Sequence, residues 1–418
     1  MKKKISILVF LLFVLKAEAQ TSPFILIDSV LERGNYKVVL KLLSDINPPN
    51  FKSNVKTAKI YEGIEEHTKA IFYYEKALTF QEDMLVNINI GRVYQKLDND
   101  KKAIEIFEKV LIENPDNLLL KYQLGKLFLS ERKGKKAITT FKDLILKDKE
   151  NANYSYQLAR GYALNRKRDL SINSFLDAYQ KDKIHLKSIY QLANSYYLLR
   201  DEDSTALFIN IGLKLDKNHI NLNRLKVNRF YKNKEYLQSI EVLKHLDSIE
   251  PNETYTQNMM AKSYYNLSEY ELAKSYFEKS IKIDRSDYKI YTYLGNIETE
   301  LGNLREANMK YVMAIMYGKV DMDDEYYGMA IVSLKENKKE DALRMLNKAY
   351  EENSKNYKVI YQLALVEDAL RKDKKKAYRL YKDYINSFED KDSKQTSFVK
   401  TRIKEIEKDY FFRREKLD

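Results

Sequence analysis

The stretch Leu118–Phe128 reads LLLKYQLGKLF and contains a motif that the chain repeats at a fixed interval. The motif is Tyr-Gln-Leu followed by Gly or Ala. Its copies begin at four positions, the first three of them 34 residues apart: Tyr122, Tyr156, Tyr190 and Tyr361. Within the first copy, Leu124, Leu127 and Phe128 lie at i, i+3 and i+4, which is one face of an α-helix. A helical segment that recurs with one period indicates a repeat protein.

Small residues recur with the same period. If Leu118 is the first residue of a unit, the eighth residue is small in most units: Ala58, Gly91, Gly125, Ala159, Ala193, Ala261, Gly295, Ala330 and Ala364. Twelve places later a second small residue recurs: Ala70, Ala103, Ala137, Ser171, Thr205, Ser239, Ala273, Ala307, Ala342 and Ala377. An aromatic residue follows four places after it in most units: Tyr74, Phe107, Phe141, Phe175, Phe277, Tyr311 and Tyr381.

This pattern predicts two antiparallel helices in each unit. Small residues let two helices approach closely, and aromatic residues fill the wider gaps between them. The composition agrees, because 11 Gly and 5 Pro in 418 residues leave few breaks between helices. Pro115 and Pro251 fall where units close, as helix-ending residues should. Since one pair of helices cannot bury both of its faces, we expect neighbouring pairs to stack.

The unit length, the paired small positions, the aromatic residue and the closing Pro resemble tetratricopeptide repeats. About eleven such units run from Phe24 to about Phe388, within a predicted solenoid of residues 20–388. The Trp that this family places near the start of its first helix is absent, and Tyr or aliphatic residues stand there instead. The resemblance implies an all-α, right-handed superhelical solenoid in which the first helix of each pair, helix A, lines the concave side.

The residues beyond the last unit, 389–418, are predicted to form a polar linker and a capping helix. The linker begins with the charged run Glu389–Lys394. We expect the helix over Phe398–Arg413, with four apolar members: Phe398, Ile403, Ile406 and Tyr410. Such a helix would cover the apolar end of the final repeat.

Residues 1–19 resemble an export signal. Lys2–Lys4 form a basic start, Ile5–Leu15 an apolar run, and Ala17–Ala19 a small-x-small cleavage site. The apolar run is shorter than the roughly 20 residues of a membrane span, and an uncleaved anchor is the alternative. Cleavage before Gln20 removes four Lys and one Glu, so the formal net charge falls from +13 to +10. We expect an exported protein that is periplasmic or associated with the cell envelope.

The sequence offers little for catalysis or metal binding. The absence of Cys excludes thiol nucleophiles and thiolate metal sites. His185 and His219 lie one repeat apart, but no third ligand accompanies them. The acidic run Asp321–Glu325 lacks the Gly and the distal Glu of a calcium loop, and it suits a helix N-terminus instead. We therefore expect no enzymatic activity, no cofactor and no bound metal.

The family resemblance places the ligand surface on helix A, mainly at the second, fifth, ninth, twelfth and thirteenth positions. The fifth position holds the Tyr of the repeated motif, and the ninth lies one helical turn further along the same face. The predicted partner-binding residues are Tyr122, Tyr156 and Tyr190 at the fifth position and Arg92, Lys126, Arg160, Asn194, Asn228 and Lys262 at the ninth. The carboxylate-clamp members of the family also use Lys, Asn and Arg on successive A helices, but Tyr here replaces a cation that such a clamp requires.

These features predict a scaffold of the bacterial cell envelope that binds an extended or acidic segment of another protein in its concave groove. Cations pair with carboxylates, Asn amides bond a ligand backbone, and Tyr provides flat contact area. The alternative for the Tyr ladder is packing between helices. A basic surface would also suit anionic glycans or lipid headgroups. A one-base-per-repeat RNA reader is disfavoured by the 34-residue step and the export signal.

Overall fold

The computed structural model describes residues 23–319 and 321–417, so the predicted signal segment lies outside the described residues. Over these ranges the chain forms 23 helices and no strands. None of these helices is long and apolar enough to cross a bilayer. The chain divides into two compact units, Met1–Asp201 and Glu202–Asp418, which we call unit 1 and unit 2.

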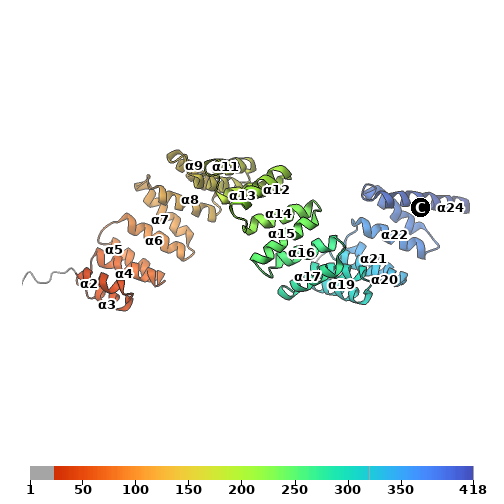
Figure 1. Cartoon of the computed structure of the whole chain (residues 1–418), viewed down its shortest axis with the longest axis horizontal. Helices are drawn as coiled ribbons and strands as arrows, with labels where there is room; N and C mark the ends of the chain where they lie inside the picture. The colour runs from red at the N-terminus through yellow and green to blue at the C-terminus, as the bar shows by residue number, and fades with distance from the viewer. Residues whose placement is uncertain (1–22, 320, 418) are drawn as a thin grey trace, which may run out of the picture. The chain divides into compact units, whose positions relative to one another are not determined.

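In unit 1 the helices alternate between A and B positions (Figure 1). The A helices are α2 (Pro23–Glu32), α4 (Phe51–Gly63), α6 (Met84–Lys96), α8 (Leu118–Ser130), α10 (Ala152–Leu164) and α12 (Leu186–Leu199). The B helices are α3 (Tyr36–Ser44), α5 (His67–Leu78), α7 (Asp100–Glu113), α9 (Gly134–Lys147) and α11 (Arg168–Lys181).

Unit 2 continues the alternation and adds one last helix. Its A helices are α14 (Ile220–Lys232), α16 (Thr254–Asn266), α18 (Tyr288–Glu300), α20 (Asp323–Lys335) and α22 (Tyr357–Leu370). Its B helices are α13 (Glu202–Leu215), α15 (Tyr236–Ile249), α17 (Tyr270–Ile283), α19 (Leu304–Tyr317), α21 (Lys339–Glu352) and α23 (Lys375–Phe388). The final helix is α24 (Ser393–Arg413). In chain order, α2 to α23 make eleven successive A and B segments, which agrees with the predicted number of units.

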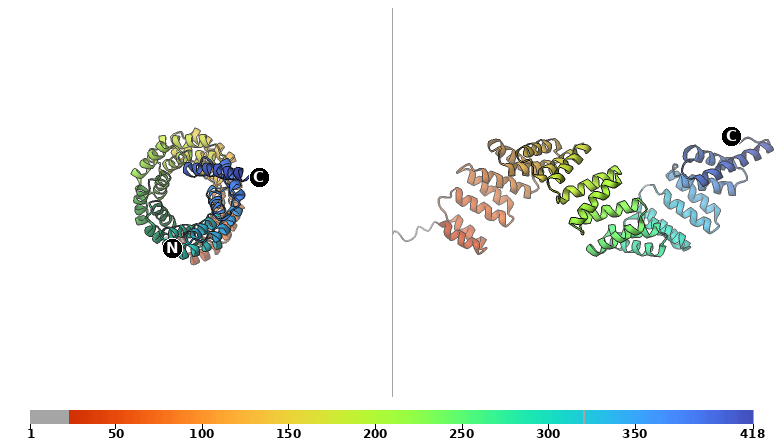
Figure 2. Two further views of the ribbon diagram at one scale, coloured as in Figure 1. Left: turned by 90° about the vertical axis from the view of Figure 1, so that its right-hand side faces the viewer. Right: turned by 45° about the horizontal axis from the view of Figure 1, so that its top comes forward.

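Within each unit, every helix contacts the helix before it and the helix after it, and the right-hand view of Figure 2 shows successive helices side by side. Two pairs of successive A helices also touch, α8 with α10 and α18 with α20. This nearest-neighbour packing is the stacking that the repeats predicted, and the fold is an all-α repeat solenoid.

The small residues of the repeat lie where helix A meets helix B, as predicted. Ala137 and Ala273 have no exposed surface. The aromatic residue of helix B covers the small eighth residue of helix A. A Cβ added to Gly125 would lie 2.6 Å from Cζ of Phe141, and one added to Gly295 would lie 2.6 Å from Cε1 of Tyr311. The two helices therefore approach too closely at these points for a larger residue to fit without a shift of the ring.

The turn from helix A to helix B has the same backbone geometry in most repeats. One residue at its centre has a positive φ, and these residues are spaced mostly by 34: Gly34, Glu65, Asp98, Arg132, Arg166, Arg200, Lys234, Ser268, Gly302 and Asn337. After Arg132, the N–H of Lys133 donates to the carbonyl of Phe128 at 2.7 Å, which is the Schellman end of a helix. Only two of these residues are Gly. In the others, the hydrogen bonds of the Schellman turn and the surrounding packing hold the left-handed conformation.

The capping helix forms, but two details of the prediction are wrong. Helix α24 begins at Ser393 rather than Phe398, because Asp392 caps its first N–H groups. Phe398 is 44% exposed, and the buried face instead contains Thr396, Val399, Ile403, Ile406 and Tyr410. The helical face that meets α23 passes through residue 399 rather than residue 398, which the sequence period alone did not show.

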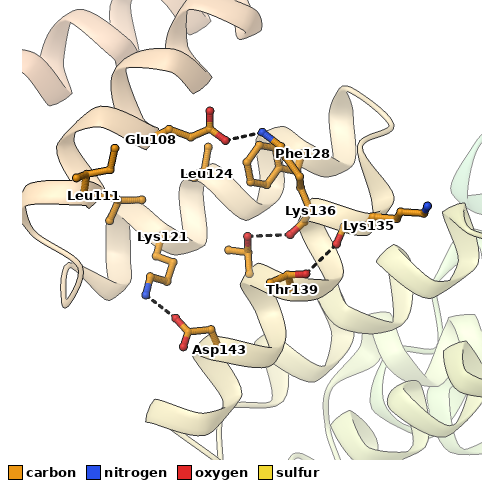
Figure 3. Close-up of a pocket in the computed structure, with 11 residues that line it drawn as sticks. Glu108, Leu111, Lys121, Leu124, Phe128, Lys135, Lys136, Thr139 and Asp143 are labelled. Carbon is orange, nitrogen blue, oxygen red and sulfur yellow. Dashed lines mark hydrogen bonds and ion pairs between the residues drawn. The ribbon is translucent and has the colours of Figure 1, made fainter.

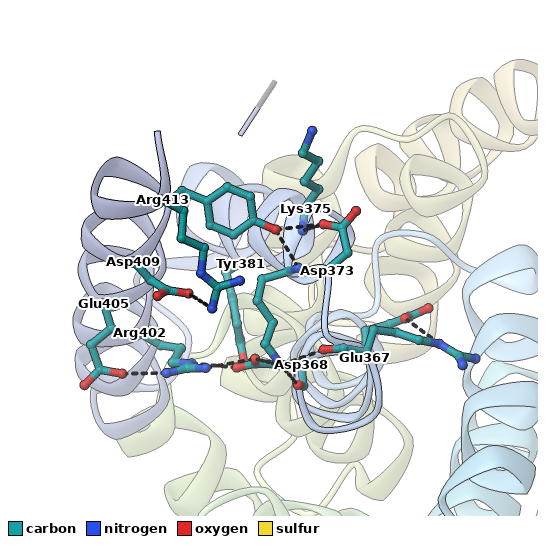
Figure 4. Close-up of polar contacts among 12 residues, drawn as sticks. Glu367, Asp368, Asp373, Lys375, Tyr381, Arg402, Glu405, Asp409 and Arg413 are labelled. Atoms are coloured by element: carbon teal, nitrogen blue, oxygen red, sulfur yellow. Dashed lines mark hydrogen bonds and ion pairs between the residues drawn. The ribbon is translucent and has the colours of Figure 1, made fainter. Parts of the chain in front are cut away.

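A polar cluster fastens α24 to the end of α22 (Figure 4). The guanidinium of Arg402 donates from Nε and one Nη to the two oxygens of Asp368, at 2.7 and 3.0 Å. Tyr381 donates to the same carboxylate at 3.2 Å. Further along the helix, the hydroxyl of Tyr410 donates to Asp373 at 2.8 Å. The cap is therefore held by directed hydrogen bonds as well as by its apolar face.

Candidate functional site

Four cations of unit 1, three of them predicted site residues, form a row along the ninth position of successive A helices. Lys59, Arg92, Lys126 and Arg160 are all exposed, one each on α4, α6, α8 and α10. None of them forms an ion pair among the described residues, although Lys56, Lys96 and Lys121 on the same helices each pair with a carboxylate. We call these four residues the cation row. Its charges are not compensated within the described chain and are available to an anionic partner.

The Tyr of the repeated motif lies beside the cation row and is half-buried. Tyr122 packs edge-on against Phe141 of helix α9, with the ring centres 6.0 Å apart, and against Tyr154 of the next A helix at 5.7 Å. Its hydroxyl accepts from the Nε2 of Gln157 at 3.2 Å. The ammonium of Lys126 lies 5.3 Å from the centre of the Tyr122 ring. One Tyr thus joins helix A to its own helix B and to the following repeat.

Tyr156 occupies the same place one repeat later. Its ring centre lies 5.6 Å from that of Phe175 and 5.3 Å from that of His185, which precedes α12. Burial raises the pKa of the Tyr156 phenol. Tyr190, the third member, is also half-buried. Tyr122 and Tyr156 therefore contribute to packing between repeats, and all three fifth-position Tyr keep part of their surface exposed.

A pocket opens at the end of the cation row, between α10 and α12. It has a volume of about 520 Å³ and contains both Arg160 and Asn194, two of the predicted site residues. The remaining polar lining includes Arg166 of the turn after α10, Arg168 at the start of α11 and Gln191 of α12. Its apolar lining includes Ala163, Ile172 and Phe175. We call it the arginine pocket, because three Arg and no Asp or Glu line it.

The ninth position in unit 2 is different, because its side chains already have partners. Asn228 accepts from the hydroxyl of Tyr255 at 2.9 Å. Lys262 is half-buried, its ammonium lies 5.7 Å from the centre of the Tyr293 ring, and burial lowers its pKa. Asn296 accepts from the hydroxyl of Tyr311 at 2.7 Å. These residues hold neighbouring helices together and offer less to a ligand than the cation row.

A further hollow lies on the helix-B side of unit 1, between α7 and α9 (Figure 3). Its volume is about 830 Å³, and Leu124 and Phe128 of α8 are among its lining residues. Two ion pairs join its walls, Lys136–Glu108 at 2.7 Å and Lys121–Asp143 at 2.5 Å. Two of the three lysines that line this hollow are paired with carboxylates, so it carries less uncompensated charge than the arginine pocket.

The two His residues considered as metal ligands act as helix caps. The Nδ1 of His185 accepts from the N–H of Ser188 at 3.2 Å, and the Nδ1 of His219 accepts from the N–H of Leu222 at 3.2 Å. Asp323 accepts from the side-chain amides of Asn353 and Asn356, at 3.1 and 2.7 Å. Across residues 23–319 and 321–417, no group of three or more His, Asp or Glu side chains is arranged to hold a metal ion.

Comparison with known families identifies the repeat. A family model described as tetratricopeptide repeat matches residues 99–160, and a second model with the same description matches residues 52–84 and 255–287. The chain is a tetratricopeptide repeat protein. These matches fall on three separate parts of the tetratricopeptide (TPR) array, in both units.

Several solved TPR structures are similar to this chain at low sequence identity. Yeast Tom70 is 13% identical, with 93% of this chain and 95% of that chain covered and a TM-score of 0.43. A TPR protein from Parabacteroides merdae is 14% identical over 60% of this chain and 98% of that chain, with a TM-score of 0.44. YrrB, described as a TPR protein with an unusual peptide-binding site, is 16% identical over 46% of this chain and 98% of that chain, with a TM-score of 0.40. No curated protein matches the chain.

The residues that sequence reasoning missed lie in the turn after α10 and at the start of α11. Arg166 and Arg168 line the arginine pocket, but the family positions used for the prediction all lie on helix A. A signal was present, since Arg166–Arg168 is a run of three basic residues. This basic run lines a pocket only because the next A helix lies opposite it, where Gln191 and Asn194 form the other wall.

Proposed function

We propose that this TPR protein is a non-enzymatic scaffold that binds an extended, acidic segment of a partner protein along the helix-A side of unit 1. The observation that carries the proposal is the cation row. Its four cations are exposed on consecutive A helices, and none has a carboxylate partner among the described residues. TPR proteins in general bind other proteins, and an acidic chain supplies the charges that this row lacks.

The spacing of the row favours an extended ligand over a compact one. Packed helices lie about 8–10 Å apart, which is close to the length of three residues of extended chain. A single segment can therefore place one carboxylate near each cation in turn. The half-exposed Tyr122 and Tyr156 beside the row provide flat contact surface with few rotatable bonds.

We further propose that the protein acts in the bacterial cell envelope. The support is the sequence of residues 1–19, with its basic start, apolar run and small-x-small site. The first residue of the exported protein is then Gln20. N-terminal sequencing of protein recovered from the envelope fraction tests this step, and Met1 retained on cytoplasmic protein would refute it.

The binding proposal is tested with a labelled poly-glutamate 12-mer and fluorescence anisotropy. Reversing two charges of the row, in Arg92→Glu with Lys126→Glu, should weaken binding at least about tenfold, because attraction becomes repulsion at the site. The matched control is Lys101→Glu with Lys109→Glu, which changes two exposed lysines of helix B by the same total charge. Equal loss in both variants would mean that net charge alone attracts the peptide, and the row would then have no special role.

A further inference from the structure

The arginine pocket combines two properties that rarely occur together on a protein surface. Its charged lining consists of Arg160, Arg166 and Arg168, with no carboxylate among the lining residues. One of these guanidiniums has a distant carboxylate neighbour, since Nε of Arg168 lies 4.0 Å from Oδ1 of the adjacent Asp169. Arg160 donates to the amide oxygen of Gln157 at 2.9 Å, which leaves its charge uncompensated. Three cations with a shared apolar floor suit an anion that also carries apolar surface.

The floor of the pocket is firm. Phe175 is 3% exposed and is fixed by the ring of Tyr156, and Ile172 of the same helix is also buried. Ala163 is exposed on α10 and leaves the space open, because it is the smallest side chain with a Cβ. In the preceding repeat the same twelfth position holds the larger Leu129. The small side chain of Ala163 thus leaves room for the cavity, which Leu129 also lines.

We propose that the arginine pocket binds one large apolar side chain of the partner segment, flanked on both sides by Asp or Glu. The apolar side chain lies against Ile172 and Phe175, and the flanking carboxylates pair with Arg160, Arg166 and Arg168. Arg suits this role because its guanidinium presents several N–H donors to a carboxylate. The inference rests on the proposed function, since the cation row leads the acidic segment to the pocket, and it specifies which partner residue is selected.

The test uses two labelled peptides that differ in one residue. Each has four Glu-Asp pairs on either side of a central residue, which is Leu in one peptide and Ser in the other. The Leu peptide should bind about 10–100-fold more tightly to the full-length protein, as expected for burial of one apolar side chain. Ala163→Phe fills the pocket from within and should remove this preference without changing any charge.

Matched controls separate the pocket from general effects. Gln95→Phe places the same ring at the twelfth position of α6, outside the pocket, and should keep the preference for Leu. Arg166→Ala should weaken binding of both peptides about tenfold, whereas Arg132→Ala should not. Arg132 is the fair comparison, because it is exposed at the same turn position one repeat earlier and has a φ of 54°, against 55° for Arg166.

The outcomes distinguish this inference from the proposed function. If neither peptide binds the wild-type protein, the proposed function fails and the inference fails with it. If both peptides bind equally well and the cation-row variant still weakens them, the proposed function stands and the pocket inference is overturned. Vesicles of phosphatidylglycerol that bind the wild type but not Ala163→Phe would reassign the pocket to a lipid and would also overturn it.

Discussion

At the scale of single residues, the repeated Tyr-Gln-Leu motif has a structural role in this protein. In the copy that begins at Tyr156, the Leu is buried and the Tyr reaches the next repeat at His185. The Gln donates to Tyr122 of the preceding copy and accepts from Arg160. This copy of the motif therefore joins its own repeat to the repeat before it and to the repeat after it. Part of each Tyr is also exposed beside the cation row, so packing and binding share one side chain.

Substitution of Tyr156 tests how these two roles divide. Tyr156→Ala removes a half-buried ring from between Phe175 and His185 and should lower the free energy of unfolding by about 1–3 kcal/mol. Tyr156→Phe keeps the ring and should cost less than about 0.5 kcal/mol. Urea denaturation followed by circular dichroism measures both. If Tyr156→Ala unfolds like the wild type but binds poly-glutamate more weakly, the ring serves the ligand rather than the fold.

The residue at the N-terminal cap of α12, His185, makes the stability of unit 1 depend on pH. His185 is buried, and burial lowers its pKa below the usual 6.5, so the folded state favours the neutral ring whose Nδ1 caps Ser188. Asp182, Lys187, Tyr156 and Asn153 face or neighbour this ring. Because the folded pKa is depressed, the stabilisation is complete above about pH 6.5 and is lost as the pH falls below it.

The check compares the wild type with His185→Asn at several pH values. Asn is the cap residue at the same place in other repeats, such as Asn117 before α8, and it does not titrate. Between pH 7.5 and pH 5.0 the wild type should lose more stability than His185→Asn, as measured by urea midpoints. Parallel loss in the two proteins would show that His185 does not contribute to the pH dependence.

At the scale of helices, each element of the array is ended by a defined device. Most A helices end in a turn with one left-handed residue, and several begin at an Asn, Asp or His cap. The last repeat has no following helix A, so α24 takes that place against α23. The bidentate bond between Arg402 and Asp368 joins it to α22 as well. A solenoid end that would expose apolar surface is thereby covered.

The bond to Asp368 is the contact of α24 most open to test. Although burial opposes its ionisation, hydrogen bonds from Arg402 and Lys374 hold the pKa of Asp368 below its usual value. Arg402→Met removes the bidentate partner from a carboxylate that is 9% exposed, and should lower the free energy of unfolding by about 1.5–3 kcal/mol. Arg413→Ala breaks an exposed pair with Asp409 on the same helix and should cost less than about 0.5 kcal/mol. Equal midpoints for the two variants in urea would contradict the assignment.

At the scale of the whole molecule, contacts are local along the chain. Each helix touches its neighbours in sequence, and the apolar core is divided into separate clusters that each span neighbouring repeats. In such an array stability is close to a sum over repeats and the interfaces between them. Damage to one repeat should therefore remain near its origin.

Ala273→Leu tests this locality. Ala273 is fully buried where α16 meets α17, so a larger side chain overpacks the contact and should cost about 1–3 kcal/mol. Hydrogen exchange should accelerate in α16, α17 and α18 and remain unchanged in α4 to α8. Lys279→Leu, on an exposed face of α17, serves as the control for the added apolar bulk. Uniform acceleration through both units would show that the array unfolds as one cooperative body.

Much of this protein was readable from its sequence, because a repeat forces equivalent residues into equivalent places. The period of 34, the small residues and the aromatic residue predicted the number of helix pairs and the buried contacts such as Ala137 and Ala273. These contacts lie within one helix pair of the repeat, and a local sequence pattern can specify them.

Tertiary structure decided the features that depend on what a neighbouring repeat brings into contact. The sequence placed a cation or Asn at the ninth position of each repeat from Lys59 to Asn296, but only packing shows that Arg160 is uncompensated while Asn228 is bound to Tyr255. The arginine pocket requires the exposed Ala163, the turn after α10, the start of α11 and the C-terminal part of α12 together. The buried face of α24 likewise depends on the surface of α23, which is why Val399 and not Phe398 is buried. Periodicity determines which residues face inward, whereas compensation of charge depends on distances between repeats that no single repeat encodes.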